Sequence, residues 1–259
     1  MDIPGVLTSR NVRTVSLVVT LIDDLTGRVI TGSNARAWID NERPPIKKAE
    51  GWSVFLNLPE GEYTVFAEGG VYNKKACVCN INKEGYTDLK IRLTPNRVYR
   101  LPGGTSVIRG EAPSGSAVIA YPSDKSAAYK LLSNVKNGAE SIGIFHPENI
   151  DIGGKLFYIM GDDGKGELLR VGAPLSNCPD SSDKKSEYKL WQAAKNPYPK
   201  IGTLLFPVSE AMADSSGEFF IPIANIPEKG CLFICESEQT RVEITLGRGE
   251  TRRVEFPKE

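Results

Sequence analysis

The residue types that most often carry out catalysis are few in this sequence, and they are not grouped. His146 is the only histidine, the residue most often used as an acid or base near neutral pH. Because Pro147 follows it, its backbone is held extended, and we predict an ordinary loop or strand-end histidine. Ser133 and Lys136 have Ser-x-x-Lys spacing, but the companion motifs of that enzyme class are missing. The sequence therefore predicts no catalytic residue.

Four of the five cysteines form two closely spaced pairs, which raises the question of a metal site. One pair is Cys77 and Cys79, and the other is Cys231 and Cys235. Structural zinc sites usually take each ligand pair from a tight turn, whereas both pairs here lie in segments typical of strands. Small buried side chains are the better interpretation. We predict no metal site and no cofactor, and the odd number of cysteines stays unexplained.

Carboxylates and glycines come together in Asp162-Asp163-Gly164-Lys165-Gly166-Glu167. Carboxylates can bind calcium or hydrolyse glycosides, but an EF-hand loop needs oxygen ligands at alternate positions over about twelve residues. This segment lacks that pattern, so we predict a hairpin tip with hydrated charges. Gly247-Arg248-Gly249 joins two predicted strands and does not open a helix, so it is not a phosphate-binding loop.

Aromatic side chains near turns are further candidates for ligand binding, because exposed rings can stack on sugars. They are Trp52, Tyr63, Tyr72 and Tyr86. Strand periodicity, however, places Trp52 on one face with Val54 and Leu56, and Tyr63 on one face with Val65 and Ala67. Such apolar faces are typical of the buried side of a sandwich. Core packing is therefore the first interpretation, and carbohydrate binding is the second.

The elements that must position these residues are predicted to be almost entirely strands. Short β-branched and aromatic runs alternate with Gly, Pro, Asn and Asp, a pattern typical of antiparallel sandwiches. In the first part of the chain they predict strands at 15–22, 35–40, 52–56, 62–68, 75–81 and 87–93. In the second part they predict strands from 105 and at 116–120, 141–145, 156–160, 167–171, 203–206, 218–223, 231–235, 241–246 and 251–256.

Residues 100–104, Arg-Leu-Pro-Gly-Gly, suit neither a helix nor a sheet interior and predict a domain boundary. We therefore expect an all-β chain of two antiparallel Ig- or prealbumin-like β-sandwiches, at 10–98 and 105–257. The second carries a large insertion at about 121–214, with one or two short helices. Residues 184–195 fit a helix with Ser186 as N-cap, and residues 127–135 fit either a helix or one arm of a hairpin at Asn137-Gly138.

An internal repeat links the two predicted sandwiches. Each copy has a glycine turn, a strand, a bend of the type Asn-x-Pro-Glu and a further glycine. The copies are Gly51-Trp52-Ser53-Val54-Phe55 with Asn57-Leu58-Pro59-Glu60-Gly61, and Gly217-Glu218-Phe219-Phe220-Ile221 with Asn225-Ile226-Pro227-Glu228-Lys229-Gly230.

Together with Asp24-Leu25-Thr26-Gly27-Arg28, these motifs carry a resemblance to a known family. Residues of roughly 14–95 resemble the carboxypeptidase regulatory-like family of prealbumin-like β-sandwiches, and residues 105–256 resemble a diverged copy. The resemblance covers motifs that specify turns. It implies a non-catalytic module used for assembly, attachment or stabilising a neighbour.

Charge and hydropathy limit the classes of partner. The 32 Lys and Arg residues equal the 32 Asp and Glu residues, so no bulk positive charge is available to bind nucleic acid. The apolar run at 15–22 is too short for a membrane span and lacks a signal-peptide cleavage site. We expect synthesis in the cytoplasm without a signal peptide, followed at most by release or display within an assembly.

The leading prediction is a non-enzymatic structural or protein-interaction module, such as a component of a bacterial surface or phage-tail-like assembly. The alternatives are a carbohydrate-binding module and, third, an enzyme whose site lies in the insertion. We place the main protein contact in the insertion, on the predicted helix that carries Tyr188, Leu190 and Trp191, because loops and insertions on rigid scaffolds often carry binding. The sequence names neither the partner nor the oligomeric state.

Overall fold

The fold is all-β, as the sequence predicts. The computed structural model describes residues 13–82, 85–146, 150–161, 164, 166–175, 185–238 and 240–256. Over these residues the chain forms strands β1 to β19 and one short 3-10 helix, η1 (Lys125–Ala127), and it has no α-helix. Consequently, none of the described residues lies in a helix long and apolar enough to cross a membrane.

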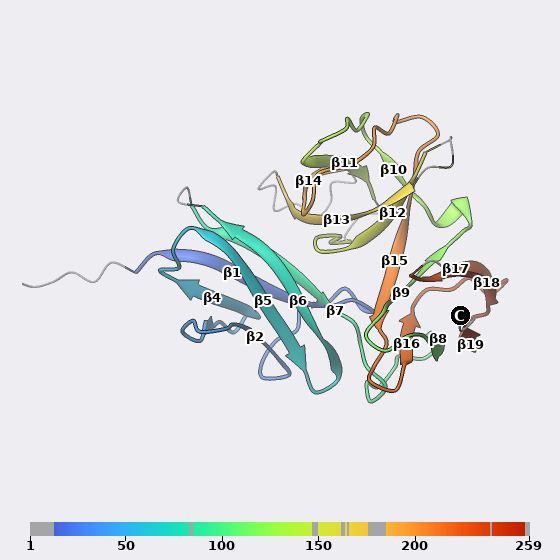
Figure 1. Ribbon diagram of the computed structural model, residues 1–259, viewed down its shortest axis with the longest axis horizontal. Helices are drawn as coiled ribbons and strands as arrows, with labels where there is room; N and C mark the ends of the chain where they lie inside the picture. The colour runs from blue at the N-terminus through green and yellow to red at the C-terminus, as the bar shows by residue number, and fades with distance from the viewer. Residues whose placement is uncertain are drawn as a thin grey trace, which may run out of the picture.

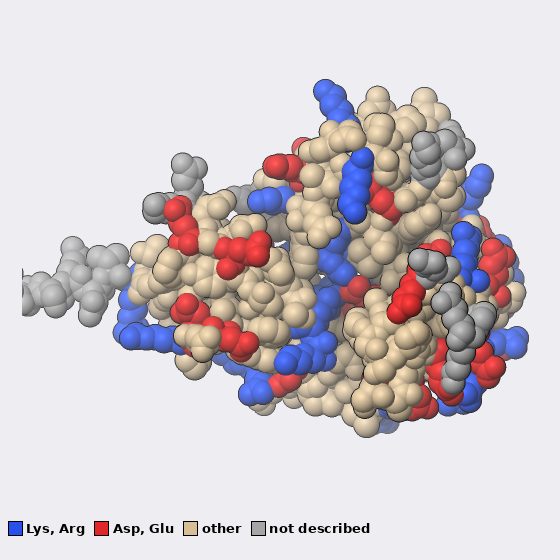
Figure 2. Space-filling view, viewed as in Figure 1, with Lys and Arg blue, Asp and Glu red and all other residues tan. Residues whose placement is uncertain are grey.

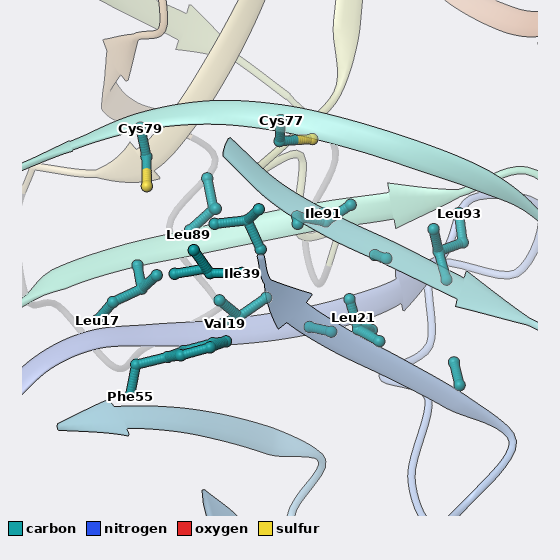
Figure 3. Packing of buried hydrophobic residues seen from close by; sticks show 14 of the residues in the cluster. Leu17, Val19, Leu21, Ile39, Phe55, Cys77, Cys79, Leu89, Ile91 and Leu93 are labelled. Atoms are coloured by element: carbon teal, nitrogen blue, oxygen red, sulfur yellow. The ribbon is translucent and has the colours of Figure 1, made fainter. Parts of the chain in front are cut away.

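The first unit consists of two sheets packed face to face. One has the strand order β3 (Ile46–Lys47), β4 (Trp52–Leu56), β1 (Val15–Asp23), β7 (Thr87–Leu93). The other has the order β2 (Ala35–Ile39), β5 (Gly61–Gly69), β6 (Tyr72–Ile81). Alternate residues of both sheets point into a shared core, where Leu17, Val19 and Ile91 are fully buried (Figure 3).

The second unit repeats this strand arrangement. Its first sheet has the order β16 (Glu218–Ile223), β8 (Ser106–Glu111), β19 (Thr251–Glu255), and its second contains β9 (Ala117–Pro122), β17 (Cys231–Ser237) and β18 (Thr240–Leu246). In each unit the first strand pairs antiparallel with one neighbour and parallel with the last strand, as β1 does with β4 and β7, and β8 with β16 and β19. The sequence repeat therefore corresponds to a structural repeat.

The turns of the two copies also share backbone conformations. Gly51 and Gly217 precede the matching strands β4 and β16 with φ of 93° and 84°. Asn57 and Asn225 follow those strands with φ of 56° and 61°, in the left-handed region that few residues other than glycine and asparagine adopt.

The predicted insertion forms a closed six-stranded ring, shown above the other two units in Figure 1 and hereafter called the barrel. Its strands are β10 (Tyr129–Leu131), β11 (Ser141–Phe145), β14 (Lys185–Leu190), β13 (Gly166–Pro174), β12 (Leu156–Met160) and β15 (Leu204–Met212). Pairing of β10 with β15 closes the ring, and every strand contributes to one apolar interior. The far end of β15 leaves the ring and pairs with β9 of the second unit.

The helix predicted at 184–195 is wrong, because residues 185–190 form strand β14. Its side chains have the two-residue period of a strand: Tyr188 and Leu190 are buried while Lys189 is exposed. In place of one or two short helices, the described part of the insertion contains only the three-residue η1. Residues 127–135, predicted to be either a helix or one arm of a hairpin, contain β10. It pairs with β11, and the connecting residues 132–140 include the turn at Asn137-Gly138.

Candidate functional site

The three residues predicted to contact a protein partner pack against other parts of the same chain. Tyr188 and Leu190 are each 4% exposed in the barrel interior, and the Tyr188 hydroxyl lies 3.0 Å from His146 Nε2. Trp191 is half-buried, packs against the core of the first unit, and has the Arg170 guanidinium 5.4 Å from its ring centroid. Trp191 thus marks a junction between the barrel and the first unit.

Glu210 of β15 connects three elements at this junction. Its carboxylate accepts hydrogen bonds from Lys75 Nζ of β6 at 2.6 Å and from Arg170 Nη2 of β13 at 2.7 and 2.8 Å. Burial by itself would raise the pKa of Glu210, but the two cations outweigh it and hold the pKa at about 2. Thr94 adds a hydrogen bond of 3.0 Å to the Glu210 carbonyl oxygen.

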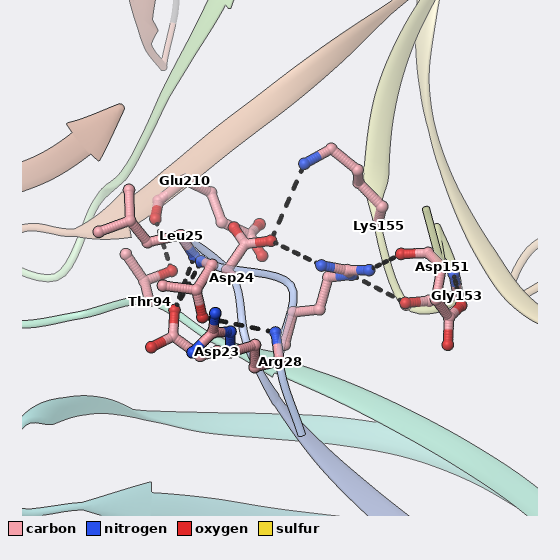
Figure 4. A network of polar contacts seen from close by, with 12 residues as sticks. Asp23, Asp24, Leu25, Arg28, Thr94, Asp151, Gly153, Lys155 and Glu210 are labelled. Atoms are coloured by element: carbon pink, nitrogen blue, oxygen red, sulfur yellow. Dashed lines mark hydrogen bonds and ion pairs between the residues drawn. The ribbon is translucent and has the colours of Figure 1, made fainter. Parts of the chain in front are cut away.

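Arg92 of β7 is the most buried charge at the junction, with 4% of its side chain exposed. Its guanidinium donates to the carbonyl oxygens of Gly153, at 2.8 Å, and Asp151 in the barrel. Its Nη1 also lies 3.5 Å from Oδ1 of Asp24. These contacts, whose dashed lines end at Asp24, Asp151 and Gly153 in Figure 4, join the first unit to the barrel through one side chain.

Beside Arg92, two glycines allow the barrel to approach strand β7 closely. A Cβ atom on Gly153 would lie 2.6 Å from Lys90 Cδ, and one on Gly154 would lie 2.5 Å from the Lys90 carbonyl oxygen. Lys90 Nζ in turn donates to Asp151 Oδ2 at 2.7 Å. Burial acts to raise the pKa of Asp151, but Lys90, the Gly153 amide and Arg92 together outweigh it, and the pKa is lowered.

The segment that leads to the second unit is also anchored. Tyr99 and Tyr72 donate to Oδ2 of the buried Asp23 at 2.5 and 2.9 Å. Burial and the bond to the Asp23 carboxylate raise the pKa of Tyr99 to about 12. Arg97 pairs with Glu218 at 2.6 Å, across the boundary between the first and second units. The predicted boundary at 100–104 therefore lies next to a segment fixed by hydrogen bonds.

A cleft of about 430 Å³ opens where the three units meet. All three contribute to its wall: Asp24 and Pro95 from the first unit, Tyr129 and Lys155 from the barrel, Pro222 and Phe233 from the second unit. Oδ1 of Asp24 is buried with no hydrogen-bond partner, although it lies 4.0 Å from Lys155 Nζ. The cleft therefore combines proline and aromatic side chains with polar groups and an incompletely satisfied charged pair, and we call it the junction cleft.

The other residues singled out by chemical type lie apart from this cleft, with one exception. His146 is 4% exposed inside the barrel, and its Nε2 lies 3.4 Å from Ser186 Oγ. Cys77 and Cys79 are in the first core and Cys235 is in the second core, whereas Cys231 is partly exposed and lines the cleft. Burial raises the pKa of Cys79 to about 11, which favours the unreactive thiol.

No group of three or more metal-ligating side chains occurs within the described residues. Four residues of interest lie outside the described part of the chain: Asp162, Asp163, Lys165 and Cys178. The hairpin tip predicted around Asp163-Gly164 therefore stays a prediction.

The four aromatic residues considered for sugar binding do not form a platform. Tyr72 is buried, whereas Trp52 and Tyr86 are 46% and 62% exposed and lie at separate strand ends. A different aromatic pair does share an outer sheet face: Trp38 and Phe66 stack with ring centroids 5.5 Å apart. The cations of Arg36 and Lys74 lie over these rings at 5.0–5.3 Å.

Sequence reasoning missed the charges of the junction. Arg92 and Arg170 alternate with apolar residues along strands, and Lys75 and Glu210 follow the polar residues Lys74 and Ser209, as solvent-facing charges also do. The Gly153-Gly154 pair was the one available signal, because adjacent glycines often mark a close approach of two backbones. Only pairing between distant strands brings these residues together.

No known protein-family model and no curated protein sequence matches this chain. Among solved structures it is similar to the Bacillus anthracis TIE protein, with 10% identity over 94% of this chain and 51% of that chain, at a TM-score of 0.27. It is also similar to domains 4 and 5 of the S-layer protein SbsC, with 12% identity over 91% of this chain and 79% of that chain, at a TM-score of 0.18. This chain spans about half the length of the TIE chain. TM-scores this low do not establish a shared fold.

Proposed function

We propose that this protein is a non-catalytic structural and protein-interaction module that holds three β units at fixed angles within a larger assembly, of the bacterial surface or phage-tail-like kind. One observation carries the proposal: Glu210 and Arg92 bind across unit boundaries and fix the units to one another. A buried charge is stable only when paired, so these contacts favour a single arrangement of the units.

We further propose that both sandwiches belong to the carboxypeptidase regulatory-like family, with prealbumin-like topology. The repeated strand pairing and the repeated asparagine turns support this assignment. Interspersed positive and negative side chains on the face in Figure 2 fit recognition by shape and local contacts, not by a long-range field.

Cross-linking in a lysate of the native host, followed by separation by size, tests the proposed function. The protein should elute in a complex much larger than its 28.3 kDa and carry cross-links to the same neighbouring proteins in every preparation. Elution as an uncross-linked monomer would contradict an assembly role.

Carbohydrate binding stays as a second candidate because of the stacked Trp38 and Phe66 rings with two flanking cations, which suit an acidic polysaccharide. Titration of the whole chain with acidic and neutral polysaccharides, in parallel with Trp38→Ala, tests it. Binding of the acidic polymer that Trp38→Ala abolishes would support this candidate, and equal binding by both proteins would exclude the Trp38 face.

A further inference from the structure

The junction cleft contains an amine whose surroundings differ from those of the neighbouring lysines. Lys75 Nζ donates to Glu210 at 2.6 Å, and Lys90 Nζ donates to Asp151 at 2.7 Å. Lys155 Nζ has no hydrogen bond to any described residue, and its closest charged partner is Asp24 Oδ1 at 4.0 Å. Its side chain is 20% exposed and lines the cleft. The Lys155 amine is therefore accessible from the cleft and makes no hydrogen bond to the described residues.

The walls of the cleft favour an organic ligand. Proline rings and aromatic side chains form part of its wall, beside polar side chains such as Asp124, Ser126 and Asn225. A volume of about 430 Å³ is within the range of small-molecule sites. Examples from the three units are Pro95, Pro207, Pro222, Tyr129 and Phe233.

The charged and titratable groups around Lys155 come from each packed element. They are Asp24 after β1, Arg92 of β7, Asp124 and Tyr129 around η1 and β10, and Cys231 of β17. Burial lowers the pKa of the Lys155 amine, Asp24 opposes that effect and Arg92 reinforces it, so the pKa lies below its ordinary value. More of this amine is then neutral near pH 7 than of an exposed lysine.

We propose that the junction cleft is a binding site for small aldehydes or ketones, which form an imine with the amine of Lys155. The neutral nitrogen attacks the carbonyl carbon to give a carbinolamine. Both amine protons then leave with the former carbonyl oxygen as water, and the C=N bond forms. Asp24 Oδ1, 4.0 Å from Nζ, is the carboxylate closest to the proton that moves between nitrogen and oxygen.

The experiment uses the full chain with benzaldehyde as the probe and sodium cyanoborohydride to reduce any imine at pH 7. Peptide mapping measures, in one sample, how fast Lys155 and Lys136 are labelled. Lys136 is an exposed lysine of the same barrel. We expect Lys155 to be labelled several-fold faster than Lys136, because the cleft holds the aldehyde beside an amine whose lowered pKa leaves more of it neutral. Its rate should also saturate with benzaldehyde concentration, whereas that of Lys136 should rise linearly.

Variants sharpen the result. Lys155→Arg should remove the fast, saturable labelling, and Lys136→Arg should retain it. Because the two lysines are compared within the wild-type protein, the test does not depend on either variant folding. Labelling of Lys155 at or below the rate of Lys136, or a rate that rises linearly with benzaldehyde, would overturn the proposal. The proposed structural function would be unaffected by that outcome.

Discussion

Individual charged residues of this protein stabilise contacts between units that lie far apart in the sequence. Glu210 is separated from its partner Lys75 by 135 residues, and Arg92 from Gly153 by 61. Removing one member of such a pair leaves the other charge poorly solvated, which destabilises a protein more than losing a surface pair does. The residues of the junction therefore allow sharp tests.

Glu210→Gln should lower the free energy of unfolding at pH 7 by about 2 kcal/mol, because Lys75 and Arg170 lose their shared negative partner. The folded-state pKa of Glu210, about 2, is below its ordinary value. Its contribution is thus complete above about pH 4.3 and is lost as the pH falls through about 2. Urea unfolding at several pH values should show the wild type and the variant converging in acid.

The matched control is Glu68→Gln, which removes the exposed ion pair with Arg36 inside the first unit. That variant should differ from wild type by less than about 0.5 kcal/mol. A difference for Glu210→Gln that is equally small, or that does not change with pH, would contradict the pairing described here.

Gly154→Ala should destabilise the protein by about 2–4 kcal/mol, because φ is 75° and the new Cβ would lie 2.5 Å from the Lys90 carbonyl oxygen. Gly138→Ala provides the control: φ is 76° there, but no atom lies within 4 Å of the new Cβ. It should show only the backbone strain, about 1 kcal/mol. Equal losses in the two variants would show that the close approach to β7 contributes nothing.

At the scale of strands and turns, local pattern predicts most of the fold. The predicted strands at 52–56, 87–93, 141–145 and 218–223 have the observed bounds, since alternating β-branched and aromatic residues fit a half-buried sheet. The helix prediction at 184–195 is wrong because a serine, a glutamate and a later proline are also the start and stop signals of a helix. Pairing with β11 and β13 overrides that local preference in β14.

The same substitution can be made in both copies of the repeated turn, at Asn57 and at Asn225. Asn225→Ala should lower the free energy of unfolding by about 1 kcal/mol, because alanine is strained at φ near 60°. Asn57→Ala should lower it by more, because it has the same strain and also loses a hydrogen bond. Asn57→Gly relieves the strain but loses the bond from the Thr14 amide to Oδ1, so part of the loss should remain. Asn225→Gly should be nearly neutral. Urea unfolding measures all four, and no loss in either alanine variant would contradict the shared turn geometry.

At the scale of the whole molecule, the sequence does not reveal the barrel or the junction cleft. Closure of the barrel depends on pairing Tyr129 with Leu205, which no local pattern specifies. The cleft likewise needs all three units in place. Residues of a site that three units form together can be identified only once the long-range contacts are known.

The first unit should fold without the rest of the chain, since its apolar core draws almost entirely on its own two sheets. Expressed alone, residues 10–98 should give dispersed amide resonances and a cooperative melt. Its melting temperature should be below that of the unit in the full chain, because Trp191 and the barrel contacts are lost. A fragment without cooperative unfolding would mean that the unit depends on the barrel.

Fixed angles between the units should depend on Arg92. Arg92→Ala removes donors from the carbonyl oxygens of Gly153 and Asp151 and a cation from Asp24, so the first unit should move more freely against the barrel. Small-angle X-ray scattering should show a larger radius of gyration, while hydrogen exchange stays slow in all three cores. Arg36→Ala, which removes an exposed pair within the first unit, should leave the scattering unchanged. If Arg92→Ala scatters as the wild type does, Trp191 and the other apolar contacts are sufficient to hold the units, and the buried charges set stability but not shape.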